Sequence, residues 1–158
     1  MIILIVAIDE SGLIGSRGKM AWHNQDDLNW FAHKTKDSEV LMGRTTFEHL
    51  PKPLLNRYVH VVTSHADFKI DQRDGCVCLN PISMIKQFKD EGKNLYICGG
   101  KQIYELAYDY VDEMYVSIIP GIHEGDTYLD LDLSMFYCES IIENNNFTLK
   151  HYRRGENL

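Results

Sequence analysis

The feature that most constrains this chain is its opening run, residues 1–8, which is apolar at every position and ends abruptly at Asp9. A strand covered on both faces has this pattern, whereas a strand with one face in water alternates between apolar and polar residues. The run is far shorter than the roughly 20 residues of a membrane span. It also lacks the basic start and the small-residue cleavage site of a signal peptide. We therefore expect a strand buried on both faces, and no membrane partner.

Segments with strand and helix character alternate after this run. Short apolar runs predict strands at 40–42, 59–62, 76–79 and 95–98. Apolar residues at helical spacing predict one helix that starts in the acidic stretch 25–27 and reaches Thr35, and further helices at 44–50, 81–90 and 103–110. Three strand-like segments close the chain, at 113–119, 136–142 and 147–152, and the stretch 143–146 marks a hairpin between the last two.

This order predicts one α/β domain over residues 1–158, with a central, mostly parallel twisted sheet, an antiparallel C-terminal hairpin and helices on both faces. In such folds ligands bind beyond the carboxyl ends of the parallel strands, at a change of strand order. The loop 9–24 is long for a compact domain and contains Gly12, Gly15 and Gly18. We therefore expect it to act as a lid or a binding loop.

Charge and cysteine content exclude several classes of protein. The chain has 16 basic against 23 acidic residues, a net charge of −7, so a diffuse surface for nucleic acid is not expected. The four cysteines, Cys76, Cys78, Cys98 and Cys138, lack the spacing of a metal site. We expect reduced, mostly buried thiols in a cytoplasmic protein without a metal. No apolar heptad suggests a partner helix, so a monomer is expected.

Asp27 is the most informative titratable residue. It lies at the start of a predicted helix, one turn from Phe31 on the same side. A carboxylate against an apolar wall loses hydration, its pKa rises, and it can bind an amidine-like edge through two parallel hydrogen bonds. The alternative is a first-turn acid in water with no chemical role, which is the interpretation we keep for Asp26.

Small and cationic residues follow several predicted strands. Gly99-Gly100, between a strand and a helix, lets backbone approach a phosphate, although a tight turn explains the pair equally well. The stretch 43–46 and Thr63-Ser64 add an arginine and hydroxyls, which could bind a phosphate monoester. The alternative is that the arginine is a surface cation and the threonine caps a helix. Arg57 suits a carboxylate, or a surface ion pair.

Taken together, these residues resemble the dihydrofolate reductase family along nearly the whole chain. Each matching segment is short, but their order and spacing are highly specific. The segments are 4–7 with Asp9, 12–15, Trp22, Asp27-Leu28 with Phe31, 42–47, Pro53-Leu54 with Arg57, Thr63-Ser64, Gly99-Gly100 with Ile103-Tyr104, and 125–128.

The resemblance implies NADPH-dependent reduction of 7,8-dihydrofolate to 5,6,7,8-tetrahydrofolate, with hydride passing to pterin C6 and a proton to N5. The implied catalytic residues are Asp27 beneath the pterin, Trp22 in the closing loop and Thr127 supporting the carboxylate. The implied substrate residues are Ile5, Asp27, Leu28, Phe31, Leu50, Leu54, Arg57 and Thr127. Those implied for NADPH are Ala7, Ile14, Met20, Gly43, Arg44, Thr45, Thr46, Thr63, Ser64, Gly99, Gly100, Lys101, Gln102, Ile103 and Tyr104.

More specific roles also come from the resemblance. Arg44 with Thr63 and Ser64 would bind the 2′-phosphate that distinguishes NADPH from NADH. Arg57 would bind the α-carboxylate of the glutamate tail, and the Gly99-Gly100 bond would be cis.

The chain departs from the family pattern at Ala21 and at Asn24-Gln25, where prolines are usual, at Leu55-Asn56, and at Ala32 and Cys98. The first two changes free the backbone of the closing loop, and Asn56 can still adopt a left-handed conformation. Two other functions stay open at this point: a pyrimidine ribosyl reductase of flavin synthesis, and a non-catalytic folate-binding protein. The stretch from Trp22 to Asp27 and Arg57 disfavour the first.

Overall fold

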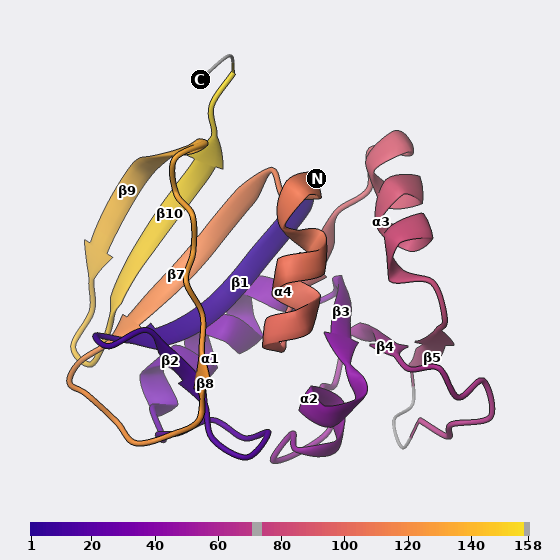
Figure 1. The fold of residues 1–158 in the computed structure, drawn as a ribbon, viewed down its shortest axis with the longest axis horizontal. Coiled ribbons are helices and arrows are strands. Elements are labelled where there is room, and N and C mark those ends of the chain that lie inside the picture. The colour runs from indigo at the N-terminus through magenta and orange to yellow at the C-terminus, as the bar shows by residue number, and fades with distance from the viewer. Residues whose placement is uncertain (71–73, 157–158) are drawn as a thin grey trace.

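A computed structural model describes residues 1–70 and 74–156. In that part of the chain one eight-stranded sheet has the order β5-β4-β3-β6-β1-β7-β10-β9, and a second, two-stranded sheet pairs β2 with β8 (Figure 1). The strands are β1 (Ile2–Asp9), β2 (Leu13–Gly15), β3 (Glu39–Gly43), β4 (Tyr58–Val62), β5 (Gly75–Cys78), β6 (Leu95–Ile97), β7 (Glu113–Ile119), β8 (Thr127–Tyr128), β9 (Phe136–Glu143) and β10 (Thr148–Arg154).

The large sheet is parallel from β5 to β7, and β10 runs antiparallel to both of its neighbours. The predicted fold class, including the antiparallel C-terminal hairpin, is therefore confirmed. β1 lies between β6 and β7, which explains why its sequence is apolar at consecutive positions: both of its edges and both of its faces are covered.

Alternate residues of β1 pack against different helices, because successive side chains of a strand point to opposite faces. Leu4 and its even-numbered neighbours join the core beneath α3 (Pro81–Asp90) and α4 (Lys101–Ala107). Ile5 and its odd-numbered neighbours pack with Trp30 and Phe31 of α1 (Gln25–Thr35) and with Phe47 of α2 (Arg44–Glu48). Helices therefore cover both faces of the sheet, as predicted.

Polar residues define where the two longest helices begin. The Asn24 side chain accepts a hydrogen bond from the Asp27 backbone N–H at the start of α1. Asn80 does the same for Ser83 in α3, and Pro81 occupies the first turn, where no backbone donor is needed. The bounds of α3 match the predicted helix 81–90.

Several boundaries differ from the prediction. The loop 9–24 contains β2, which pairs with β8, and a three-residue and a two-residue strand are too short to show an alternating pattern. The predicted helix 103–110 divides into α4 and a 3₁₀ turn, η1 (Tyr108–Tyr110). The expectation of mostly buried thiols is wrong: all four cysteines are free, but only Cys78 is buried and Cys138 is exposed. Among the described residues, no helix is both long and apolar enough to cross a membrane.

Candidate active site

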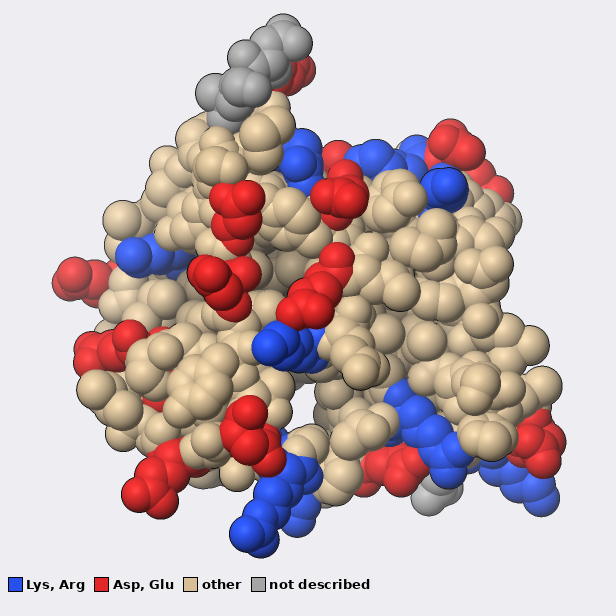
Figure 2. Space-filling view, viewed as in Figure 1, with Lys and Arg blue, Asp and Glu red and all other residues tan. Residues whose placement is uncertain are grey.

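The carboxyl ends of the parallel strands bring the predicted site residues to one edge of the sheet. Gly43 ends β3, Thr63 follows β4, and the Gly99-Gly100 pair follows β6. Figure 2 shows a hollow at this edge, between the loop after β2 and α2, with lysine and arginine side chains on its rim. The strand arrangement alone therefore assembles glycines, hydroxyls and cations that lie far apart in the sequence.

The glycine pair lies at this edge of the sheet, directly after Cys98, which follows β6. The Gly99-Gly100 peptide bond is cis, as the family resemblance implied. The Gly43 backbone N–H donates to the Gly99 carbonyl at 2.8 Å, so the ends of β3 and β6 lie in direct contact. A side chain at Gly99 would approach the Tyr104 hydroxyl to 3.2 Å, at a φ of +112° that L-residues rarely adopt. Both the backbone conformation and the close packing therefore require glycine at this position.

Asp27 is buried, at 5% exposure, in the second position beyond the start of α1. Burial raises the pKa of its carboxyl, and a hydrogen bond from the Ser117 side chain opposes this effect. The interpretation of Asp27 as a first-turn acid in water is wrong, because its side chain is buried. Asp26, in contrast, is exposed and bonds the Asn146 side chain.

The expected support of Asp27 by Thr127 is also wrong. The Thr127 hydroxyl donates to the neighbouring Asp126 carboxylate at 2.8 Å, and Thr127 lies in β8, opposite Gly15. The hydroxyl that reaches Asp27 belongs to Ser117 in the middle of β7, where it is 1% exposed. The physical reason is the register of β7 against β1. The two strands pair in parallel with Ala7 opposite Ser117, and this register places Ser117 beside the face of the sheet that α1 covers.

Apolar side chains gather on the face of the sheet that α1 covers. Ile5 of β1 packs in one cluster with Phe31, Leu50 and Leu54, and Leu28 is half-buried one residue beyond Asp27. Cys98, which departs from the family pattern, packs against the same cluster, and its burial raises the pKa of its thiol. The result is an apolar wall with one acid in it.

Two cations flank this wall. The Arg57 guanidinium donates to the Thr35 hydroxyl at 3.1 Å and to the carbonyls of Leu55 and Ala32, so the last turn of α1 and the loop before β4 fix its position. Burial lowers the pKa of Arg57. Asn56, just before it, adopts the expected left-handed conformation with φ +62°.

Arg44 begins α2, where it pairs with Glu48 one turn on and lies 4.4 Å from the centre of the Phe68 ring. Thr63 is buried and accepts a hydrogen bond from the His65 backbone, and Ser64 is exposed. A cation, an aromatic face and hydroxyls therefore meet at the ends of β3 and β4.

The remaining residues implied for NADPH lie at the same edge with varied exposure. Tyr104 is buried, and its hydroxyl donates to the Ile5 carbonyl at 2.8 Å, which ties α4 to β1. Ala7, Ile14 and Thr46 are half-buried, Ile103 is buried, and Met20, Thr45, Lys101 and Gln102 are exposed.

Comparisons with known proteins agree with this geometry. A family model described as dihydrofolate reductase matches residues 1–153. The chain belongs to the dihydrofolate reductase family. The dihydrofolate reductase of Mycoplasma genitalium is 32% identical over 159 residues, which cover 99% of each chain. That of Bacillus subtilis is 33% identical over 126 residues, 80% of this chain and 73% of the relative.

A solved structure gives the same result. The dihydrofolate reductase from Enterococcus faecalis, complexed with NADP(H) and RAB-propyl, is 28% identical with a TM-score of 0.85. The match covers 99% of this chain and 97% of that one.

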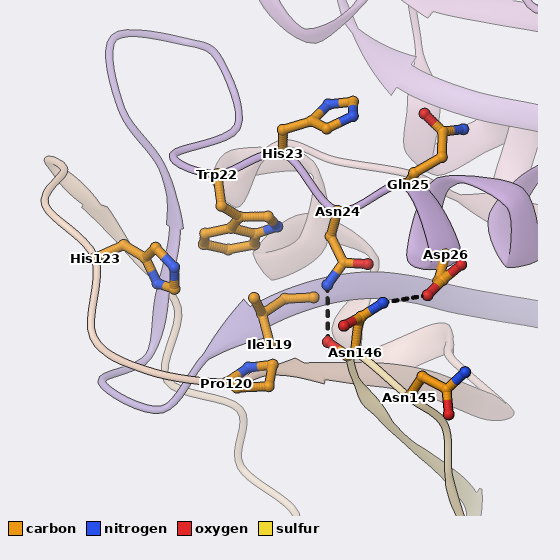
Figure 3. A pocket seen from close by; sticks show the side chains of 10 residues that line it. All are labelled: Trp22, His23, Asn24, Gln25, Asp26, Ile119, Pro120, His123, Asn145 and Asn146. Carbon is orange, nitrogen blue, oxygen red and sulfur yellow. Dashed lines mark hydrogen bonds between the residues drawn. The ribbon is translucent and has the colours of Figure 1, made fainter.

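Hydrogen bonds hold the loop 9–24 of this dihydrofolate reductase fold at both ends. At its start, the buried Asp9 carboxylate accepts from the backbones of Ser11, Leu13 and His123. Burial opposes ionisation of Asp9, but these bonds and one from the Ser11 hydroxyl hold its pKa well below the usual range. At its end, the Asn24 amide donates to the Asn146 carbonyl at 2.8 Å (Figure 3).

Trp22 lies inside this anchored segment. Its ring is 5.3 Å from that of His123, and its buried indole N–H has no hydrogen-bond partner among the described residues. A hollow of about 460 Å³, lined by Trp22, Asn24, His123 and Asn146 among others, lies beside it and contains neither Asp27 nor the glycine pair (Figure 3). The tip of the loop reaches α2, since a side chain at Gly18 would meet Thr45 at 2.8 Å.

Sequence reasoning missed two members of this dihydrofolate reductase site. Ser117 could have been found as the one hydroxyl within the apolar stretch 116–119 of a strand expected to be buried. Glu48 could have been found from its spacing, because residues four apart on a helix are neighbours and it follows Arg44 at that distance.

Proposed function

We propose that this chain reduces 7,8-dihydrofolate to 5,6,7,8-tetrahydrofolate with NADPH. The observation that carries the proposal is the buried Asp27 carboxylate, set in an apolar wall beside the cleft that contains Gly43 and the cis Gly99-Gly100 bond. A flat heterocycle with an amidine-like edge matches such a wall with one acid in it, because two parallel hydrogen bonds then satisfy the buried carboxylate.

Asp27 is proposed to bind the amino group and ring N3 of the pterin and to favour protonation at N5. A carboxylate of low hydration stabilises a nearby positive charge more strongly than one in water, and a protonated imine is the better hydride acceptor. Ser117 holds the carboxylate in place through its hydroxyl. The Arg57 guanidinium, positioned by backbone carbonyls, is proposed to bind the α-carboxylate of the glutamate tail.

The residues at the ends of β3, β4 and β6 fit NADPH. Arg44, Thr63 and Ser64 would hold the 2′-phosphate, and the Phe68 face beside Arg44 suits a purine ring. A side chain at Gly100 would approach the Thr46 hydroxyl to 3.3 Å, so glycine there keeps the cleft open. When bound, NADPH supplies the hydride for pterin C6. Trp22 and Met20 would exclude water from the pterin when the loop closes.

The test is the loss of NADPH absorbance with dihydrofolate for the wild type and for Asp27→Asn. We expect Asp27→Asn to lower turnover strongly at neutral pH and less in acid, where the substrate arrives already protonated. Asp26→Asn is the matched control, since this adjacent acid is exposed, and it should keep the wild-type rate. An unchanged neutral-pH rate in Asp27→Asn would end the proposal.

A second assay addresses the cofactor and the assembly. Arg44→Ala should raise the KM for NADPH and leave that for NADH nearly unchanged, because only the former carries the 2′-phosphate. The protein is proposed to act as a monomer in the cytoplasm, and sedimentation at assay concentrations checks the first of these.

A further inference from the structure

Three side chains with nucleophile, base and carboxylate chemistry meet on one face of the sheet, at the start of β3, the middle of β4 and the second residue of β5. Glu39 is the first residue of β3, while His60 of β4 lies opposite Cys76 of β5. The cleft described above lies at the carboxyl ends of the same strands, so this group is at the opposite edge of the sheet. β5 is also the outermost strand of the sheet (Figure 1).

The three groups lie in line. The Cys76 Sγ is 3.2 Å from the His60 Nδ1, and the His60 Nε2 is 2.9 Å from the Glu39 Oε1. The sheet register produces this row, since residues two apart on a strand share a face and opposite residues on neighbouring strands touch. A carboxylate bound at Nε2 keeps the proton there and leaves Nδ1 as the acceptor that faces the thiol.

Packing fixes the imidazole. His60 is 8% exposed, with the Phe88 ring of α3 edge-on at 5.9 Å and the Tyr58 ring at 5.0 Å. The Tyr58 side chain also hydrogen-bonds Cys76, and that bond raises the pKa of the tyrosine. The sulfur therefore has a proton acceptor on one side and a hydroxyl donor on the other.

The group as a whole is partly exposed to solvent. Cys76 is half-buried, Tyr58 is 39% exposed and the Glu39 side chain 36% exposed. The other thiols differ. Burial raises the pKa of both Cys78 and Cys98, and the exposed Cys138 donates a hydrogen bond to the Ser140 carbonyl.

We propose that Cys76 is a nucleophilic thiol, a site of covalent modification by small disulfides, with His60 as its base and Glu39 as the residue that positions the imidazole. The His60 Nδ1 takes the thiol proton, and the sulfur anion attacks one sulfur of the disulfide RS–SR. The S–S bond breaks as the bond from Cys76 to sulfur forms. The leaving thiolate takes the proton from His60, so Cys76 is oxidised to a mixed disulfide and one half of the reagent is reduced to RSH.

The size of the effect has an upper limit. An ordinary cysteine is about 3% ionised at pH 7, so a partner that removes the proton raises the rate by at most about thirtyfold. We expect Cys76 to react at least tenfold faster than Cys138.

The folded protein is treated with a limiting amount of the uncharged reagent 2,2′-dithiodipyridine, and the modified cysteines are located and timed by peptide mass spectrometry. Cys76 should be labelled first. In guanidinium chloride the Cys76 and Cys138 rates should become equal within about twofold, because the unfolded chain no longer holds the imidazole against the sulfur. Faster labelling of Cys138 than of Cys76 in the folded protein would overturn the proposal.

Two variants separate chemistry from packing. His60→Gln should slow Cys76 at least fivefold and leave the Cys138 rate unchanged. If His60→Gln does not fold, Glu39→Gln replaces it, because the Glu39 side chain is partly exposed. We expect this variant to lower the labelling rate of Cys76 by about threefold. An unchanged Cys76 rate in the folded variant refutes the role of the imidazole. Cys76→Ser should abolish the fast labelling reaction and retain reductase activity. This result would distinguish the Cys76 site from the proposed active site.

Discussion

Ser117→Ala is expected to change the pH dependence of this protein more than any substitution at Thr127. Ser117 lies at 1% exposure opposite Ala7, so no solvent can replace its hydroxyl when the side chain is shortened. Its hydrogen bond favours the ionised carboxylate of Asp27 and opposes the burial that raises the Asp27 pKa. Removal of the donor disfavours the charged form, so the pKa of Asp27 should rise further.

The magnitude follows from the energy of the lost bond. A hydrogen bond to a charged group contributes about 1.5–3 kcal/mol. A tenfold change in an ionisation constant corresponds to about 1.4 kcal/mol. The titration midpoint of Asp27 in Ser117→Ala should therefore lie about one to two pH units above that of the wild type.

The assay is a carboxyl-carbon NMR titration of the ligand-free protein, read at the Asp27 signal, together with the pH profile of kcat/KM for dihydrofolate. Ser117→Thr keeps the hydroxyl and should retain the wild-type midpoint. Thr127→Val removes the other hydroxyl with nearly the same side-chain volume and should also leave the midpoint in place. A midpoint in Ser117→Ala within about 0.3 of the wild type, or an equal movement in Thr127→Val, would refute the reasoning.

Three further predictions concern charges in the fold. Glu48→Gln should lower the KM for NADPH by about 1.5- to 5-fold and leave the KM for NADH unchanged. The reason is that Glu48 competes with the 2′-phosphate for Arg44, and an exposed ion pair contributes about 0.2–1 kcal/mol. Steady-state kinetics with both cofactors measure this. Asp9→Asn should lower the unfolding free energy by about 2 kcal/mol at pH 7. The Asp9 pKa is depressed in the folded state, so this contribution is complete above its unfolded pKa of about 4 and is lost progressively as the pH falls from there toward the much lower folded pKa, which urea unfolding at pH 7 and at about pH 2 checks. Asp27→Asn should stabilise the fold by about 1 kcal/mol at pH 8 and by nothing in acid, since the raised pKa of Asp27 means that its ionisation opposes folding; a gain that persists at pH 3 would contradict this.

The sequence was sufficient where burial and local hydrogen bonding control the structure. Consecutive apolar residues identified β1 as a strand buried on both faces, and Pro81 marked the start of α3. The glycine pair could be placed because it directly follows an apolar strand. These patterns arise from solvent exclusion and from contacts a few residues apart, which a single chain displays along its own length.

Cross-strand partners could not be obtained in this way. The resemblance implied Thr127 as the donor to Asp27, and only the pairing of β7 with β1 selects Ser117. The contact of Cys76 with His60 likewise depends on the register of β5 against β4. A shift of one residue would turn each of these side chains to the opposite face of the sheet. Register is set by backbone hydrogen bonds between segments far apart in the chain, so the tertiary structure alone decided which polar groups meet.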